Sequence, residues 1–200
     1  ELQEKVLEVL SRTLPDDHPD LQVARTNLAG TLQTLGDFRG ARELEEKVLE
    51  VFSRTLPEDH PDLQGAWLNH GNTLGALGEL DGARKVLERV LEICTETMPD
   101  DHPNVQEARL GLARTLRDLG DLAGARELQT KAVDGYSRWL PDDHRYLQLA
   151  RAGLAWITAR LGDSYATKRL VSEIARSLRE SLRAAILSDS PREIEERAST

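Results

Sequence analysis

The chain contains 200 residues, of which 39% are hydrophobic, 30% charged and 4% aromatic, and its formal net charge is −9. Because nucleic-acid phosphates require a basic face, this acidic balance excludes a general nucleic-acid binder. Cys94 is the only cysteine, which excludes an intrachain disulfide, and no window approaches the roughly 18 apolar residues of a membrane-spanning helix, so we expect a cytoplasmic protein without membrane contact.

The sequence repeats with a period of 42 residues, and residues 1–20 differ from residues 43–62 at only three positions. Equivalent positions are held by His18, His60, His102 and His144, by Pro15, Pro57, Pro99 and Pro141, and by Gly36, Gly78, Gly120 and Gly162. A fixed period of this length indicates a solenoid, in which one supersecondary unit is copied and each copy packs mainly on its neighbours. Such a stack offers an extended surface for binding.

Residues 1–14 align with the second helix of a repeat, so they predict a helix without a partner of its own. Terminal units of a solenoid normally need a polar outer face for solubility. The apolar residues of this helix are Leu2, Val6, Leu7 and Leu10. We therefore expect an exposed apolar patch that packs on preceding sequence or supports end-to-end self-association. The chain starts at Glu1 inside a repeat, so we also expect it to be a piece of a longer protein.

The first complete repeat spans about residues 19–56. A helix is predicted over residues 19–35, because apolar side chains recur every three or four positions and Gly36 after them is a typical helix end. A second helix is predicted over residues 38–56, and it ends at Pro57 because proline has no amide hydrogen to donate. These two helices would pack as an antiparallel pair.

The later repeats follow the same plan, which predicts further helix pairs at about residues 61–98, 103–140 and 145–187. Each pair is preceded by a loop whose carboxylates and proline suit the first turn of a helix. Arg145 replaces that proline in the last copy, so we expect a looser helix start there.

The sequence predicts that the last helix caps the array. Arg183 stands where earlier repeats have a terminating proline, so the last helix extends to about residue 187. Its apolar stripe is Ile174, Leu178, Leu182 and Ile186, and its other faces are rich in Arg and Ser. The polar tail 189–200 is predicted to be disordered, which leaves an array over residues 1–188.

Small residues recur at two further positions. They are Ala29, Gly71, Ala113 and Ala155 in the first helices, and Ala41, Ala83 and Ala125 in the second helices. With the period and the inter-helix glycine, this pattern resembles tetratricopeptide repeats (TPRs) of the long-period type found in the kinesin light chain. The resemblance implies an all-α fold, a right-handed α-solenoid of stacked antiparallel helix pairs with a concave groove. It is similar, more loosely, to bacterial arrays joined to a CHAT protease or a signalling NTPase domain.

The sequence contains no recognisable motif for catalysis, phosphate binding or metal binding. The four histidines are spread along the stack and cannot share one metal ion, so we expect them to cap loops or bond between repeats. The serines lie outside any Gly-x-Ser-x-Gly turn, the glycines form no phosphate-cradling loop, and Cys94 reads as a buried core residue. We therefore predict a protein that is not an enzyme and holds no metal or cofactor.

By resemblance, side chains of the first helices line the concave groove. The groove residues predicted to bind a partner are Asn27, Asn69, Asn72, Arg114, Arg117, Trp156 and Arg160. The groove is thus amide-rich at one end and cationic at the other. Asn hydrogen-bonds a peptide backbone, Arg pairs with carboxylates and Trp anchors interfaces. These chemistries predict an acidic peptide or protein as the partner.

The leading hypothesis is a protein–protein interaction scaffold that binds a partner in this groove. The alternative is a sensor or regulatory arm of a larger effector, in which the array docks on its own protein or on a partner. A third hypothesis is self-assembly through the open N-terminal face. The groove residues could also be ordinary solvated side chains.

Overall fold

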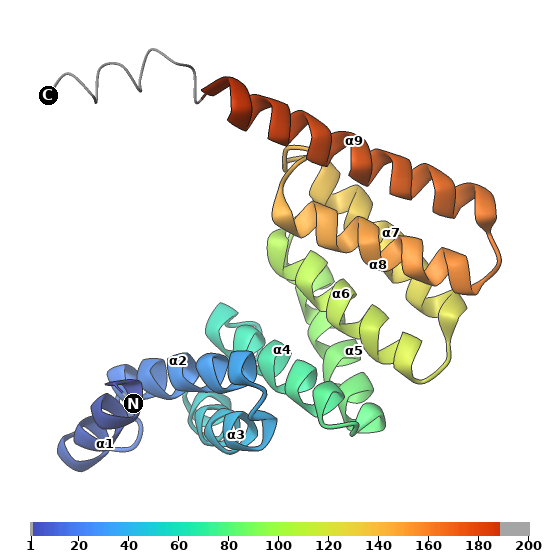
Figure 1. The fold of residues 1–200 in the computed structure, drawn as a ribbon. Coiled ribbons are helices and arrows are strands. Elements are labelled where there is room, and N and C mark those ends of the chain that lie inside the picture. Colours follow the sequence, from blue (N-terminus) through green and yellow to red (C-terminus); the bar gives the residue numbers. More distant parts are fainter. Residues whose placement is uncertain (1, 189–200) are drawn as a thin grey trace, which may run out of the picture.

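The computed structural model describes residues 2–188, and side chains up to residue 183. Within that range every regular element is a helix, and the helices stack as antiparallel pairs into one curved solenoid (Figure 1). The predicted all-α repeat solenoid is thereby confirmed; the predicted disordered tail, 189–200, lies outside the described residues. The helices are α1 (Leu2–Thr13), α2 (Pro19–Leu35), α3 (Phe38–Thr55), α4 (Pro61–Ala76), α5 (Leu80–Thr97), α6 (Pro103–Asp118), α7 (Leu122–Ser137), α8 (Arg145–Arg160) and α9 (Ser164–Ser188).

Histidine rings begin the first helix of each pair. In α2 the Nδ1 atom of His18 accepts a hydrogen bond from the backbone N–H of Asp20 at 3.2 Å, which satisfies one of the unpaired amides at the helix start. His60, His102 and His144 make the same bond at the same distance. The expected capping role is confirmed. The expectation of a looser start at Arg145 is wrong, because the cap comes from the ring of His144 and does not need the following proline.

Glycines in a left-handed conformation end the first helices. Gly36, Gly78, Gly120 and Gly162 have φ values between 77° and 91°, which other residues adopt only with strain. At Gly36 the backbone N–H groups of Gly36 and Asp37 donate to the carbonyls of Gln33 and Leu32, at 3.0 and 2.9 Å. These bonds close the end of α2 and turn the chain directly into α3.

The small residues lie where helices approach most closely. Ala41, Ala83 and Ala125 are completely buried, and a Cβ atom added to Gly71 would lie 2.7 Å from Cγ of Leu87. Larger side chains at these positions would separate the helices. Cys94 is also a core residue, 1% exposed, and burial raises the pKa of its thiol.

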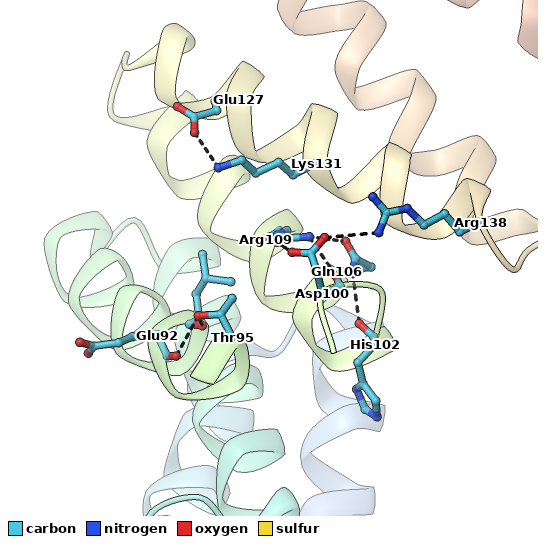
Figure 2. A network of polar contacts seen from close by, with 10 residues as sticks. Glu92, Thr95, Asp100, His102, Gln106, Arg109, Glu127, Lys131 and Arg138 are labelled. Atoms are coloured by element: carbon cyan, nitrogen blue, oxygen red, sulfur yellow. Dashed lines mark hydrogen bonds and ion pairs between the residues drawn. The ribbon is translucent and has the colours of Figure 1, made fainter. Parts of the chain in front are cut away.

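Side chains from the first helix of a pair hold the preceding loop, as Figure 2 shows for the third repeat. In the third repeat Nε2 of Gln106 donates to the carbonyl of Asp100 at 2.5 Å, and the guanidinium of Arg109 pairs with the carboxylate of Asp100. Gln22 with Arg25, and Gln148 with Arg151, make the same contacts to Asp16 and Asp142. In these three repeats the Gln–Arg–Asp contact fixes the loop against the helix that follows it.

The predicted apolar stripe of the last helix is not its buried face. In α9 the buried side chains are Leu170 and Ser177, whereas Leu178 and Leu182 are 59% and 61% exposed. The hydroxyl of Ser177 donates to the carbonyl of Asp142 at 3.0 Å, so this serine faces the preceding helix pair. The side chain of Trp139 is 46% exposed. None of the described helices is long and apolar enough to cross a membrane.

Candidate partner-binding groove

The first helices of the pairs, α2, α4, α6 and α8, carry the seven predicted groove residues. Four of them, Asn69, Asn72, Arg114 and Arg117, lie around one pocket of about 410 Å³ between α4, α6 and α8. Asn27 does not reach this pocket. It lines a neighbouring hollow of about 360 Å³, which it shares with Asn69. The structure therefore divides the groove into two hollows.

Two glycines inside helices open the larger pocket. Gly111 and Gly153 occupy the repeat positions of Asn27 and Asn69, and glycine in a helix interior costs about 1 kcal/mol relative to alanine. A Cβ atom at Gly111 would lie 2.9 Å from Oδ1 of Asn72, and one at Gly153 would lie 2.5 Å from Nε2 of Gln129. The missing side chains thus leave room for Asn72 and Gln129 and uncover the floor of the pocket.

Trp156 and Arg160 join the pocket through Arg117. The guanidinium carbon of Arg117 lies 5.3 Å from the ring centroid of Trp156, and that of Arg160 lies 5.5 Å from it. Both distances are within the range of cation–π attraction. Since the Trp156 side chain is 47% exposed, it presents an aromatic surface held between two cations. This cluster extends the cationic end of the groove beyond the pocket itself.

Arg114 and Arg117 are the cations that line the pocket. The Arg114 side chain reaches solvent, but the surrounding concave wall desolvates the guanidinium and lowers its pKa, and the neighbouring Arg117 lowers it further. Asp118 opposes this effect in part. The positive charge of Arg117 is better balanced, because its Nε donates to Oδ1 of Asp118 at 2.8 Å. A guanidinium held in this way gains from an anion brought by a partner.

Among the pocket residues that the sequence analysis missed are Glu107, Tyr136, Tyr146 and Leu149. Burial raises the pKa of Glu107. The rings of Tyr136 and Tyr146 stack at 6.3 Å, and burial, followed by the charge of Glu107, raises the pKa of Tyr136 to about 12. Glu107 and Leu149 lie one turn before Gly111 and Gly153 on the same helix faces, so extending the predicted face by one turn would have found them. Tyr136 comes from α7, and no pattern in the sequence points to it.

Comparison with known proteins identifies the repeat. Tetratricopeptide-repeat family models match residues 22–62 and 62–138, which together make up more than half of the chain. The chain belongs to the tetratricopeptide-repeat family. Its TPR array shares the architecture of interaction scaffolds and not that of typical enzymes. The predicted association with a CHAT protease or NTPase domain stays a prediction. No curated protein sequence matches the chain.

Solved structures show the same fold. Two structures of a putative kinesin light chain with nearly identical TPR-like repeats from Podosopora anserina are 24% and 25% identical, with TM-scores of 0.75 and 0.72, over 91% of this chain and 86% of theirs. BtubC (BKLC) from P. vanneervenii is 19% identical with a TM-score of 0.71, over 88% and 69%. A Rap protein complexed with competence and sporulation factor is 12% identical with a TM-score of 0.76, over 89% and 47%.

Proposed function

We propose that this TPR array binds an extended segment of a partner protein in its concave groove, with an acidic group of that segment at the cationic end. The observation that carries the proposal is the pocket of about 410 Å³, where Arg114 and Arg117 face Asn69 and Asn72. Its volume lies within the range of typical ligand pockets, roughly 300–1,000 Å³. The repeated first helices supply its walls, and the array needs no other domain to form it.

The polar groups of the pocket suit a peptide. Asn69 and Asn72 each offer a donor and an acceptor, which is the combination that backbone amides need. Arg114 and Arg117 pair with carboxylates in two-pronged geometry, and Trp156 adds aromatic contact area beside them. The apolar floor contributes desolvation, which strengthens each of these bonds.

A charge-reversal experiment tests the proposal. The immobilised protein is exposed to lysate of the source cell, and proteins captured by wild type are compared by mass spectrometry with those captured by an Arg114→Glu, Arg117→Glu variant. We expect the double variant to lose the captured partner while its circular dichroism is unchanged. A Lys47→Glu, Arg54→Glu variant makes the same charge change on exposed residues of α3 and should capture the partner normally.

Identical capture by wild type and by the Arg114→Glu, Arg117→Glu variant would contradict binding through the groove. This result would favour the alternative function, a regulatory arm that contacts other parts of its own protein.

A second candidate function is end-to-end self-association, which exposed apolar side chains favour. On α1, Leu2, Val6 and Val9 are 77%, 45% and 58% exposed and form one stripe. Replacing Val6 and Val9 by glutamate would place charges in that stripe. We expect analytical ultracentrifugation to show larger species for wild type at high concentration and none for this variant. A wild type that stays monomeric at millimolar concentration would exclude the self-association.

A further inference from the structure

Two charged side chains in the pocket form no ion pair with a described residue. Glu107 and Arg114 both line the pocket from α6, and no described residue forms an ion pair or a side-chain hydrogen bond with either. Among the four first helices, only α6 carries a charge at both repeat positions. The equivalents of Glu107 are Val23, Gly65 and Leu149, and those of Arg114 are Gly30, Asn72 and Trp156. The pair therefore belongs to this pocket and not to the repeat plan.

The helix fixes the separation of the two charges. Glu107 and Arg114 are seven residues apart in α6, which is close to two full turns, so both side chains leave the same face of the helix. At a rise of 1.5 Å per residue their Cα atoms lie about 10.5 Å apart along the axis. Leu110 and Gly111 lie between them, with Tyr136 in the floor of the pocket. The result is an anion and a cation at opposite ends of an apolar strip.

The concave wall disfavours both charges as they stand. Desolvation is the cause that raises the pKa of Glu107, and it is the first cause that lowers the pKa of Arg114. The two side chains are too far apart to neutralise one another by contact. Ion pairs and charged hydrogen bonds to a ligand would restore the solvation that each charge has lost. A ligand with only acidic groups would satisfy Arg114 but would be repelled by Glu107.

Building on the proposed function, we infer that the pocket selects a partner segment that carries one cationic and one anionic group about 10 Å apart, with the cation at Glu107 and the anion at Arg114. A segment in the polyproline II conformation has three residues per turn and advances about 3.1 Å per residue, so groups three residues apart lie on the same side of it at about this distance. The carboxylate of Glu107 takes a lysine or arginine side chain. The guanidinium of Arg114, supported by Arg117, takes an aspartate or glutamate. The partner of this groove is thus mixed in charge rather than acidic.

The charge preference is tested with short random peptides displayed on phage. Selections are run on the immobilised wild-type protein and on Glu107→Gln, Arg114→Gln and the control variant Glu50→Gln, whose exposed site lies on α3. We expect wild type and the control to enrich peptides with a basic and an acidic residue three positions apart. Glu107→Gln should keep the acidic preference and lose the basic one, and Arg114→Gln should do the reverse.

A matched pair of synthetic peptides makes the test quantitative. The best enriched peptide is compared with a copy in which its basic residue is glutamine, by fluorescence anisotropy. Wild type should bind the copy about tenfold more weakly, as expected for the loss of one charged hydrogen bond, whereas Glu107→Gln should bind both peptides equally.

The possible failures are distinguishable. If wild type and Glu107→Gln both enrich the same purely acidic peptides, the inference of mixed charge is overturned and the proposed groove function stands. If no variant enriches any peptide above the background of bare resin, while circular dichroism shows folded protein, the proposed function and this inference both fail.

Discussion

The second and third helix pairs share one backbone plan but hold their loops in different ways. In the third, α6 and α7, Arg109 is 5% exposed and pairs with Asp100 in the preceding loop. In the second, α4 and α5, Trp67 stands at the position of Arg109 and Glu58 at that of Asp100. Trp67 packs against two apolar clusters, and Glu58 turns away to pair with Arg89 of α5 at 2.7 Å. The ion pair of one loop is replaced by apolar burial in the other.

What the two loops keep in common shows which contact sets their geometry. Gln64 and Gln106 each donate to the carbonyl at the same place in the loop, at 2.5 Å in both cases. A buried amide that satisfies a backbone carbonyl is needed whatever lies beside it. The Arg–Asp pair is therefore one of two interchangeable ways to cover this bond. Trp67 shields the bond of Gln64 by hydrophobic burial. Arg109 shields the bond of Gln106 through an ion pair, whose strength depends on pH and salt.

The largest effect is expected from removing the apolar cover. Trp67→Ala should lower the free energy of unfolding by about 3 kcal/mol, because it opens a cavity between the two clusters that the indole joins. Urea titration followed by circular dichroism measures the change. Trp139→Ala is the matched control, since that indole is 46% exposed, and it should cost far less. Equal effects for the two variants would show that Trp67 does not hold the second loop.

A second contrast concerns the junctions between pairs. Glu45 and His70 are buried between α3 and α4, with Nδ1 of His70 3.4 Å from Oε2 of Glu45. Leucines occupy the equivalent positions one repeat later, as Leu87 and Leu112. Replacing both Glu45 and His70 by leucine removes the desolvation cost of two buried polar side chains, but it also removes Oε1 of Glu45, to which Gln33 and Thr73 each donate at 2.8 Å. We therefore expect the double change to alter the free energy of unfolding by less than about 1 kcal/mol. Gln33 and Thr73 would keep their mutual bond of 2.7 Å.

Single variants show whether this junction is a pair. Glu45→Leu alone leaves His70 buried without its carboxylate and removes the acceptor of Gln33 and Thr73, and His70→Leu alone removes the contact of 3.4 Å to Oε2 of Glu45. Each single change should therefore be less stable than the double change, as a double-mutant cycle in urea would show. Additive effects of the two single changes would contradict a coupled pair.

Much of this architecture was readable from the sequence, because a period of 42 residues repeats the same caps and close contacts. The helix predicted over 19–35 is α2, since His18 and Gly36 are local signals that act within one turn. The buried face of α9 was not readable, because it includes Ser177, a polar residue whose partner is a loop 35 residues earlier. Nor could the sequence predict Tyr136 in the pocket, because it comes from α7, the second helix of its pair.

The placement of groove residues was readable only in part. The four positions at Asn69, Asn72, Arg114 and Arg117 share one pocket because the repeat puts equivalent positions on adjacent helices. Asn27 instead lines a second hollow, which shares only Asn69 with the larger pocket, and the period of the repeat does not predict this division. Comparing the repeats position by position would have exposed the joint change of Trp67 and Glu58.

The pH dependence of stability should differ between the loops by a smaller amount. The hydrogen bond from Arg109 lowers the pKa of Asp100, so the folded state holds this carboxylate charged to lower pH than the unfolded state does. The stabilisation is present above the unfolded pKa, about 4, and is lost as pH falls through the folded value. Because Asp100 is largely exposed, the effect should stay below about 1 kcal/mol.

Asp100→Asn tests this difference. The variant should be less stable than wild type at pH 7, and the gap should close as pH falls toward 2, when urea midpoints are compared at each pH. Glu58→Gln, the matched change in the second loop, should show a smaller gap, because Trp67 and not an ion pair covers that loop. A gap that persists at pH 2 would show that the carboxylate acts through something other than its charge.

The smallest effect is expected at the outer contact of the third loop. Arg138 of the α7 C-terminus lies 3.6 Å from the second carboxylate oxygen of Asp100, and both side chains are more than half exposed. Such a pair is screened by solvent and salt, so Arg138→Ala should change the free energy of unfolding by no more than about 0.5 kcal/mol. Arg109→Ala, which removes the buried partner of the same carboxylate, should cost clearly more in the same urea titration. If the two changes cost the same, burial of Arg109 is not what makes its bond to Asp100 effective, and the contrast between the loops would rest on Trp67 alone.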